Sequence, residues 1–473
     1  MKPVNEEMCI VTGGRSVDVR ESTVFQAAVP VKYDVDVMVA GGGPSGLAAA
    51  ISAARQGMKV YLAEGQSVFG GMGTMGMLPM FCPFTDGVNF LVGGIGREVL
   101  EKCIEWGIDG PDPLRGLDEK LYSYVTFHPE HLKRLYDQLV VETGMSFSFH
   151  TQVMGVEKES ESRVSLVFCH AKSGIFAVRA KVFIDCTGDG DLAVMSGAQY
   201  DKGDGEGNLM PGTLCSLWAG IDWGKEPVKS WEDGRYLAQA FKDGIFSVED
   251  PGLPGMFRIG DTLGGGNMGH AFGVDSTDEV SLTRALIEQR KRMVEYGNYY
   301  KKYLPGYGNA ELAATAPLLG VRESRRITGD YVLNVNDFIR RAVFEDEIGR
   351  YAYGVDIHPS KPGMDAHVKC QEDIGKLKYA RGESYGIPYR TLTPKGLSNV
   401  LTAGRCTSCD RHMLGSVRVM PGCFITGQAA GIAAAIAVEN RTDTRGVEIG
   451  ELQKRLKQQG AFLPNYQDRS VPV

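Results

Sequence analysis

A glycine-rich segment between two apolar runs has the spacing of a phosphate-binding turn. Gly41, Gly43 and Gly46 follow the pattern G-x-G-x-x-G. In this pattern the glycines allow a tight turn, a close backbone approach to a pyrophosphate and close packing of a helix on a strand. The free amides at the start of that helix favour anions. Glu64 follows at the end of the next apolar run, where a carboxylate can bind a ribose and disfavours the 2′-phosphate of NADP.

Two arginines and two histidines in the second half of the chain could bind an anion or move a proton. Arg322 and Arg325 belong to the charged run RESRR. An arginine can hold a carboxylate through two parallel hydrogen bonds, although a salt-bridged strand edge would explain the same run. His270 lies in a glycine-rich segment and His358 in GVDIH, and a histidine can transfer protons near neutral pH. The spacing does not decide between them, and each could be structural.

Cys406 and Cys409 form a C-x-x-C pair, a pattern found in redox disulfides and in zinc sites. No second pair completes a zinc ligand set, so we favour two packed thiols and keep a redox disulfide as the alternative. His128 and His131 could place two rings on one face of a helix start, but surface histidines explain them as well. We therefore predict no metal site.

The elements expected around the first glycine motif form a βαβ unit. The apolar run 35–40 indicates a buried parallel strand, followed by a small-residue helix and a second strand up to Glu64. Three strand-like runs between 144 and 186 predict an antiparallel meander. Further elements are expected toward the C-terminus: a helix over about 277–303 with Ser276 or Thr277 as N-cap, a strand-to-turn segment at 398–404, a helix over 423–438 and a tail helix near 447–459.

A second G-x-G-x-x-G, at 264–269, provides a comparison for the first. No strand-like run precedes it and no helix-like run follows it, so we expect a loop there and no separate NAD(P)H domain. Glycine-rich turns at 69–76, 185–191 and 403–405 follow the first motif instead. Separated turns that can converge on one extended ligand favour FAD over NAD.

The run DVDVMVAGGGPSGLAAAISAARQGMKVYLAE resembles FAD-dependent oxidoreductases of the class related to the fumarate reductase flavoprotein. FIDCTGDGDLAVMSGA, GVRESRRITGDYVL, GVDIH and AGRCTSCDRHMLGSVRVMPGCFITGQAAGIAAA are similar to the FAD-dependent oxidoreductase family, most of whose members have no assigned substrate. The resemblance covers about residues 30–465 and implies FAD and the fold rather than a particular reaction. The sequence departs from the family's pattern at Cys409 and His412.

The resemblance implies a set of contacts to FAD. The first motif would hold the pyrophosphate, Glu64 the adenosine ribose and the backbone of Val153 the adenine. A helix start at 421–424 would face the N1–C2 carbonyl of the flavin, where a helix N-terminus stabilises the anionic reduced form. The cofactor-binding residues predicted in this way are Gly41, Gly43, Pro44, Ser45, Gly46, Glu64, Gly71, Met72, Gly73, Thr74, Val153, Thr187, Gly188, Asp189, Gly404, Arg405, Arg418, Gly422, Cys423 and Phe424.

We predict an α/β fold with a Rossmann-like FAD-binding domain, an antiparallel meander and an inserted α+β substrate domain. The 473 residues suit two to four domains of roughly 100–200 residues each. We expect the active site at the isoalloxazine, where the two domains meet. The predicted boundaries are an N-terminal extension at 1–33, an FAD-binding domain at 34–80, 120–200 and 386–445, a substrate domain at 81–119 and 201–385, and a C-terminal helix and tail at 446–473.

Composition narrows the classes of partner and the compartment. The formal net charge of −7 disfavours binding to a nucleic-acid backbone. The first residues lack the apolar core of a secretory signal, and the apolar stretch 423–438 is shorter than the ~20 residues of a membrane span. We therefore expect a cytoplasmic protein with reduced cysteines, no membrane span and no nucleic-acid partner.

The predicted function is hydride transfer between a small polar organic substrate and flavin N5, with a side chain handling the proton. The catalytic candidates are Arg322, Arg325, His270 and His358. One alternative is a flavin disulfide or electron-transfer protein that uses Cys406 and Cys409. Another is a flavin-binding subunit of a larger complex with an unknown electron acceptor or donor, because no separate NAD domain is expected. A homo-oligomer is also left open.

Overall fold

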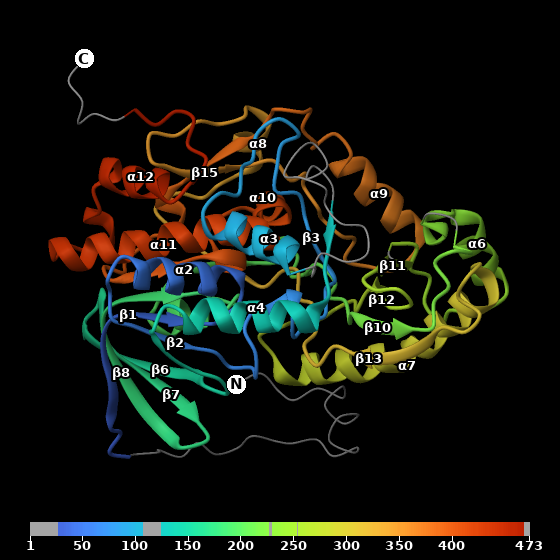
Figure 1. Cartoon of the computed structure of the whole chain (residues 1–473), viewed down its shortest axis with the longest axis horizontal. Helices are drawn as coiled ribbons and strands as arrows, with labels where there is room; N and C mark the ends of the chain where they lie inside the picture. The colour runs from blue at the N-terminus through green and yellow to red at the C-terminus, as the bar shows by residue number, and fades with distance from the viewer. Residues whose placement is uncertain (1–26, 107–123, 227–228, 253, 468–473) are drawn as a thin grey trace.

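The computed structural model describes residues 27–106, 124–226, 229–252 and 254–467 (Figure 1). Most of the predicted extension 1–33, part of the predicted segment 81–119 and the end of the tail 446–473 lie outside these residues. One part of the molecule contains a parallel sheet with helices packed on it, and a second, smaller sheet lies beside a long helix (Figure 1). The predicted α/β fold class is confirmed.

The parallel sheet has the strand order β5 (Ser146–Ser148), β2 (Val60–Ala63), β1 (Val31–Ala40), β8 (Gly174–Asp185) and β17 (Val400–Thr402). Ile184 of β8 lies opposite Val39 on one side and Leu401 on the other. Val37 and Val39 belong to one core and Met38 to another. Because the sheet is covered on both faces there, the end of β1, residues 37–40, is a continuous apolar run rather than an alternating one.

The meander consists of β6 (Gln152–Ser160), β7 (Arg163–Ala171) and the first half of β8. β8 therefore pairs with β7 along its first half and with β17 along its second half. Residues 144–186 contain four strands rather than the three expected, since β5 belongs to the parallel sheet. This arrangement brings the end of β8 to the carboxyl edge of the parallel sheet, beside the end of β1.

Two helices rich in small residues pack tightly on each other above the sheet. They are α2 (Pro44–Arg55) and α11 (Met420–Asn440), which is longer than the predicted 423–438. A Cβ on Gly427 would lie 2.1 Å from the carbonyl oxygen of Ser45, and one on Gly431 would lie 2.2 Å from that of Ala49. Among the described helices, α11 alone has the length and hydropathy of a membrane span, but 94% of its most apolar stretch is buried, so it is a core helix.

The second sheet has the order β11 (Pro254–Arg258), β12 (Gly264–Met268), β10 (Ser216–Ala219) and β13 (Glu311–Thr315). The prediction of a loop at 264–269 is therefore wrong, because the segment GGGNM forms a buried inner strand. A Cβ on Gly265 would lie 2.4 Å from Pro79, so the strand has no room for side chains on this face. It lies in an antiparallel sheet and does not open a helix, unlike the first glycine motif.

A long helix, α7 (Glu279–Tyr303), packs beside the second sheet. Its N-cap is Asp278, which accepts hydrogen bonds from the amides of Val280 and Ser281, and not the predicted Ser276 or Thr277.

The tail helix, α12 (Ile449–Gln458), lies within the predicted range. The other longer helices are α3 (Ile95–Glu105), α4 (Pro129–Val141), α6 (Gly234–Lys242), α9 (Met364–Ile374) and α10 (Arg411–Val417), and α5 (Asp191–Met195) and α8 (Val335–Ile339) are short. The remaining strands are β3 (Met80–Phe81), β4 (Val125–Thr126), β9 (Tyr200–Lys202), β14 (Arg325–Ile327), β15 (Glu347–Tyr351) and β16 (Tyr385–Pro388).

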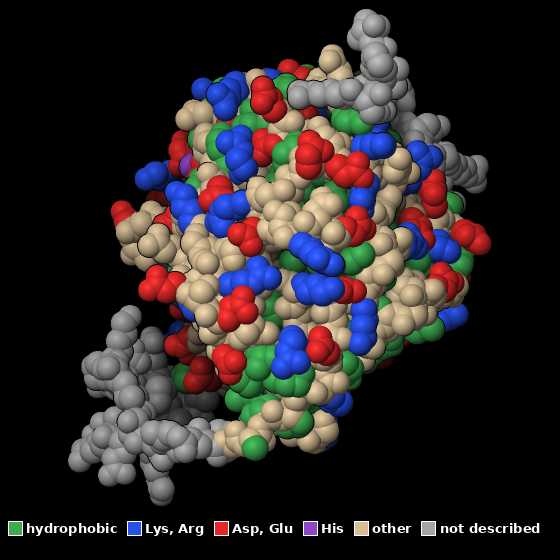
Figure 2. Space-filling view, turned by 90° about the vertical axis from the view of Figure 1, so that its left-hand side faces the viewer, with side chains coloured by type: hydrophobic (Ala, Val, Ile, Leu, Met, Phe, Trp, Pro, Cys, Tyr) green, Lys and Arg blue, Asp and Glu red, His purple; other side chains and the backbone are tan. Residues whose placement is uncertain are grey.

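The main hydrophobic core joins segments from both predicted domains. Leu91 and Leu100, from the region 81–106, and Tyr351 and Tyr385, from the region 331–387, pack in the same core as α2 and α11. The core of the second sheet is a separate cluster that includes Trp218. The domain boundaries stay a prediction. On the face shown in Figure 2, acidic and basic side chains are interspersed.

Candidate functional site

The glycine-rich turns that the sequence separates lie together at the carboxyl edge of the parallel sheet. A Cβ on Gly41 would lie 2.4 Å from the carbonyl oxygen of Cys186, and one on Gly404 would lie 2.4 Å from the hydroxyl of Ser45. Gly41 has a φ of +92°, which favours glycine. The amide of Gly70 donates to the carbonyl oxygen of Gly42 at 2.8 Å. All four turns therefore meet around the start of α2.

Gly43 differs from its neighbours, because nothing in the protein explains why it is glycine. Its φ of −68° and ψ of −176° suit any residue, and a Cβ there would meet no atom within 4 Å. In contrast, a Cβ on Gly46 would lie 1.7 Å from the carbonyl oxygen of Gly41. No side chain caps the start of α2, so its first amides are free to bind an anion. The space beside Gly43 thus fits a dinucleotide pyrophosphate.

Glu64 lies buried at the end of β2 beside this turn. Its carboxylate accepts hydrogen bonds from the amides of Gly42 at 2.5 Å and Gln66 at 2.6 Å. Burial raises the pKa of Glu64, while the two amides oppose the shift. The amide of Thr151 donates to the carbonyl oxygen of Glu64 at 2.9 Å, which places the start of β6 and nearby Val153 at the predicted adenosine end.

The turn after β8 is held by Asp185, a buried residue that sequence reasoning did not single out. Its carboxylate accepts from both the amide and the hydroxyl of Thr187, at 3.0 and 2.7 Å. Burial raises the pKa of Asp185 to about 6, although these hydrogen bonds oppose it. Asp189 forms an ion pair with Arg405 at 2.9 Å, and a Cβ on Gly188 would lie 2.8 Å from the same guanidinium. The turns at 185–191 and 403–405 are therefore joined to each other.

The turn at 69–76 packs against the start of α11 and against Gly320, in the segment before β14. A Cβ on Gly73 would lie 3.0 Å from the sulfur of Met420, and one on Gly320 would lie 2.8 Å from the end of the Met72 side chain. The amide of Cys423 donates to Val419 within the first turn of α11, whereas the start of the helix has no side-chain cap. We therefore expect the amide of Gly422, rather than those of Cys423 and Phe424, to face a ligand here.

His270 and His358, which the sequence did not connect, form one hydrogen-bonded chain with two aspartates. The ring atom His270 Nδ1 lies 2.8 Å from Asp250 Oδ1, and His270 Nε2 lies 2.8 Å from His358 Nδ1. His358 Nε2 lies 3.1 Å from Asp356 Oδ1. The side chain of His270 is 0% exposed, whereas that of His358 is 14% exposed. The pair is therefore reached from the side of His358.

Burial and nearby cations set the charge of this chain. Burial, followed by Arg322, lowers the pKa of His358 to about 3, although Asp356 opposes the shift. Burial also lowers the pKa of His270. Burial alone would raise the pKa of both aspartates, but His270 holds that of Asp250 at about 2, and His358 holds that of Asp356 well below its usual range. At neutral pH both rings are neutral and both carboxylates are charged.

Arg322 and Arg418 lie at the same cluster. Arg322 is 8% exposed and donates through one nitrogen to the carbonyl oxygen of Pro211 at 2.8 Å and the hydroxyl of Thr213 at 2.9 Å. Among the described residues it forms no ion pair. Burial, followed by the nearby charge of Arg418, lowers the pKa of Arg322 to about 10. Arg418 binds Asp356 at 3.1 Å, while its buried Nε has no partner.

Arg325 lies apart from this cluster, although it belongs to the same charged run. Its guanidinium forms an ion pair at 2.8 Å with Asp191, the first residue of α5, which follows the turn at 185–191. The structure therefore brings together Arg322, His270 and His358, with Arg418 from the predicted cofactor set, but not Arg325. The residues that sequence reasoning missed are Asp250, Asp356 and Arg292, which donates to the carbonyl oxygen of His270 at 2.7 Å.

Comparison with known proteins identifies the class to which this dinucleotide-binding fold and site belong. Residues 36–456 match the family described as "FAD dependent oxidoreductase". The chain belongs to this family, and its cofactor is FAD. No curated protein sequence matches the chain.

Solved structures with similar folds are distant from this chain in sequence. A geranylgeranyl bacteriochlorophyll reductase-like protein from Thermoplasma acidophilum is 13% identical, covers 91% of this chain and 84% of its own, and has a TM-score of 0.44. A p-nitrophenol 4-monooxygenase from Pseudomonas putida is 12% identical, covers 90% of this chain and 84% of its own, with a TM-score of 0.44.

The residues at the glycine turns fit the family's cofactor. Gly41, Gly43 and Gly46 would hold the pyrophosphate, and Glu64 the ribose. The open space at Gly43 and the uncapped start of α2 are the features that fit a bound group.

The C-x-x-C pair does not have the environment of a redox disulfide. Cys406 and Cys409 are free, buried thiols that belong to different hydrophobic clusters. Burial raises the pKa of both, which keeps them protonated and poorly nucleophilic.

We expect the double variant Cys406→Ser with Cys409→Ser to keep its FAD and most of its activity. Protein-bound flavin and turnover are the measurements. A loss of turnover beyond ~100-fold with unchanged flavin content would favour disulfide chemistry instead.

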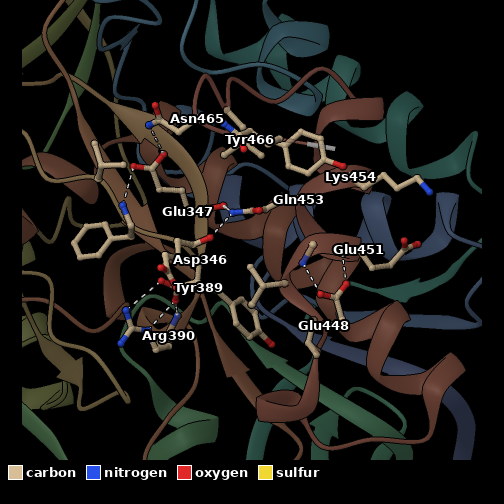
Figure 3. A pocket seen from close by; sticks show the side chains of 18 of the residues that line it. Asp346, Glu347, Tyr389, Arg390, Glu448, Glu451, Gln453, Lys454, Asn465 and Tyr466 are labelled. Atoms are coloured by element: carbon tan, nitrogen blue, oxygen red, sulfur yellow. Dashed lines mark hydrogen bonds and ion pairs between the residues drawn. The ribbon is translucent and has the colours of Figure 1, made fainter. Parts of the chain in front are cut away.

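A groove of about 1080 Å³ lies near α12, apart from these residues. Asp346, Arg390 and Glu448 are among the side chains that line it (Figure 3). Asp346 is paired with Arg390 at 2.9 Å, and Glu448 caps α12. None of the predicted site residues lines this groove, so it is not the site of the chemistry discussed below.

Proposed function

We propose that the protein is a dehydrogenase or reductase that transfers a hydride between a small polar organic molecule and flavin N5. We further propose that this molecule carries an anionic group such as a carboxylate. The observation that carries the proposal is the buried guanidinium of Arg322, which has no ion-pair partner among the described residues and lies beside His270 and His358. We also propose that the protein is related to the fumarate reductase flavoprotein class.

The charge balance around the histidine pair favours an anionic substrate. Arg292, Arg322 and Arg418 are three cations, whereas Asp250 and Asp356 are the two carboxylates that face them. With both histidines neutral, one positive charge is left in excess in a buried place. A buried charge without a partner is costly, and the carboxylate of a substrate would remove that cost.

The side chains divide the work of the reaction between them. Bound FAD supplies hydride transfer at N5. Arg322 would hold the substrate's anionic group, and the free Nε of Arg418 offers a further donor. His358, the more exposed ring of the pair, would handle the substrate's proton. The turn at Met72 connects this cluster to the cofactor turns, because Gly320 packs against Met72 and Arg322 follows two residues later.

An anaerobic substrate screen tests the proposal. Purified protein with its FAD is mixed with small carboxylates and, in parallel, with the matching amides or esters, and the oxidised flavin absorbance is followed. We expect only the carboxylates, and not the amides or esters, to bleach the absorbance of the oxidised flavin or to reoxidise the flavin after chemical reduction. Equal reaction with neutral analogues would contradict the anionic substrate, and reaction only after a partner protein is added would favour the complex subunit. We propose the cytoplasm as the location of this protein.

A further inference from the structure

The chain of four groups around the histidine pair has one more contact than it has protons. Its three contacts join Asp250 to His270 at 2.8 Å, His270 to His358 at 2.8 Å, and His358 to Asp356 at 3.1 Å. Each contact is a hydrogen bond only when one proton lies in it. A neutral imidazole carries a single ring proton, and an ionised carboxylate carries none. Two neutral rings therefore fill at most two contacts and leave at least one empty, whichever tautomers they adopt.

The empty contact is best placed between His358 and Asp356. The amide of His270 and its ring atom Nδ1 both approach Asp250, at 2.7 and 2.8 Å, which fixes the proton of His270 on Nδ1. His270 Nε2 is then an acceptor, and its 2.8 Å contact with His358 Nδ1 is a hydrogen bond when His358 Nδ1 carries the proton. This leaves His358 Nε2 as a lone pair facing Asp356, in the longest of the three contacts and at the ring with more exposure.

We propose that His270 and His358 together accept one proton during the reaction, which enters the empty contact between His358 and Asp356. His358 is the catalytic residue of this step, and Asp250, His270 and Asp356 are positioning residues. The proposal rests on the hydride-transfer function proposed above.

The step balances in protons and electrons. In the oxidative direction the substrate loses a C–H hydrogen as hydride, with two electrons, to the flavin, and loses an O–H or N–H proton to His358. The substrate is oxidised by two electrons and the flavin is reduced by two. Once three protons are present, all three contacts are hydrogen bonds. The positive charge of the protonated histidine pair then lies between the carboxylates of Asp250 and Asp356. In the reductive direction the same proton returns to the substrate.

The surroundings keep the empty contact open at neutral pH. Arg292 on α7, Arg322 before β14 and Arg418 after α10 face the pair, together with Asp250 and Asp356. Burial and these cations disfavour a third proton at rest. Other titratable groups close by stay neutral, since burial raises the pKa of Tyr296 well above its usual value. Burial also raises the pKa of Cys82 and that of Cys215 to about 12.

Ring-nitrogen NMR of the FAD-loaded protein tests the proposal without turnover. The chain has 8 histidines, and His270→Gln and His358→Gln assign the two rings. At pH 7 we expect two ring protons on the pair, on Nδ1 of each ring, and an unprotonated Nε2 on His358. Asp250→Asn should change the tautomer signals of His358, which it does not contact. His131→Gln, at the surface helix start, is the control and should change neither ring.

Three ring protons on the resting pair at pH 7 would overturn the proposal, because no contact would then be empty. Unchanged His358 signals in Asp250→Asn would also overturn it. Once a substrate is found, His358→Gln should lower kcat/KM by about 100- to 10,000-fold and remove the acidic limb of its pH profile, with FAD retained. An active wild-type enzyme whose His358→Gln variant keeps that limb would overturn the step alone. A failed substrate screen bears only on the proposed function.

Discussion

Gly43→Val should fold but purify without colour and release no FAD on denaturation. The backbone angles of Gly43 suit valine, and a Cβ there meets no protein atom within 4 Å. The apoprotein should therefore fold as the wild type does. The branched side chain, however, fills the space where the pyrophosphate approaches the backbone. The measurements are the flavin absorbance of purified protein and the chromatographic identity of the released nucleotide, which should be FAD and not FMN in the wild type.

Gly308→Val is a matched control for this variant. Gly308 is exposed, has open space around its Cβ position and lies in a loop before β13. It should keep full colour. A fully flavinated Gly43→Val protein would show that the first glycine turn does not hold the cofactor. An unfolded one would show that the open space is not open in solution.

Arg322→Lys should lower kcat/KM by about 30-fold to several thousand-fold, the equivalent of ~2–5 kcal/mol for a lost hydrogen-bonded charge contact. Lysine keeps a cation but loses the planar fork that binds a carboxylate through two hydrogen bonds. A buried lysine also loses its proton more readily than arginine, and burial and Arg418 already lower the pKa at this position. FAD content should stay the same. Steady-state kinetics with a substrate found in the screen is the measurement.

Arg325→Lys is the control, because Arg325 is paired with Asp191 and lies apart from the histidine pair. It should keep kcat/KM within a few-fold of the wild type. If Arg322→Lys also kept wild-type turnover, Arg322 would be a structural residue and the anionic substrate would lose its main support. Equal losses in both variants would indicate a general effect of the charged run.

Local patterns predicted the cofactor half of the fold well. The βαβ unit around Gly41 could be predicted because its strand, turn and helix signals are adjacent in sequence. The strand at 264–268 could not, since three glycines in a row carry no side-chain periodicity and are selected by contacts from Pro79 and Met256. The N-cap of α7 was missed by one or two residues, a usual uncertainty at helix ends.

The catalytic candidates could be predicted singly but not as a group. Asp250 precedes β11, His270 follows β12 and His358 follows β15, so only the tertiary structure brings them together. The i, i+2 spacing of Asp356 and His358 in GVDIH is a signal that could have been used. No local sequence pattern distinguishes Arg322 from Arg325, because the sequence does not show whether an arginine has an ion-pair partner.

The cofactor cradle has a consequence for how the protein is made. Ser45, beside the pyrophosphate turn, packs against Gly427, and β17 joins the parallel sheet beside β8. A ribosome that adds about 5–20 residues per second needs roughly 20–80 s to travel from Ser45 to Gly427. During that interval the apolar face of α2 has no α11 to cover it. We therefore expect the FAD site to be completed only after nearly the whole chain has been translated.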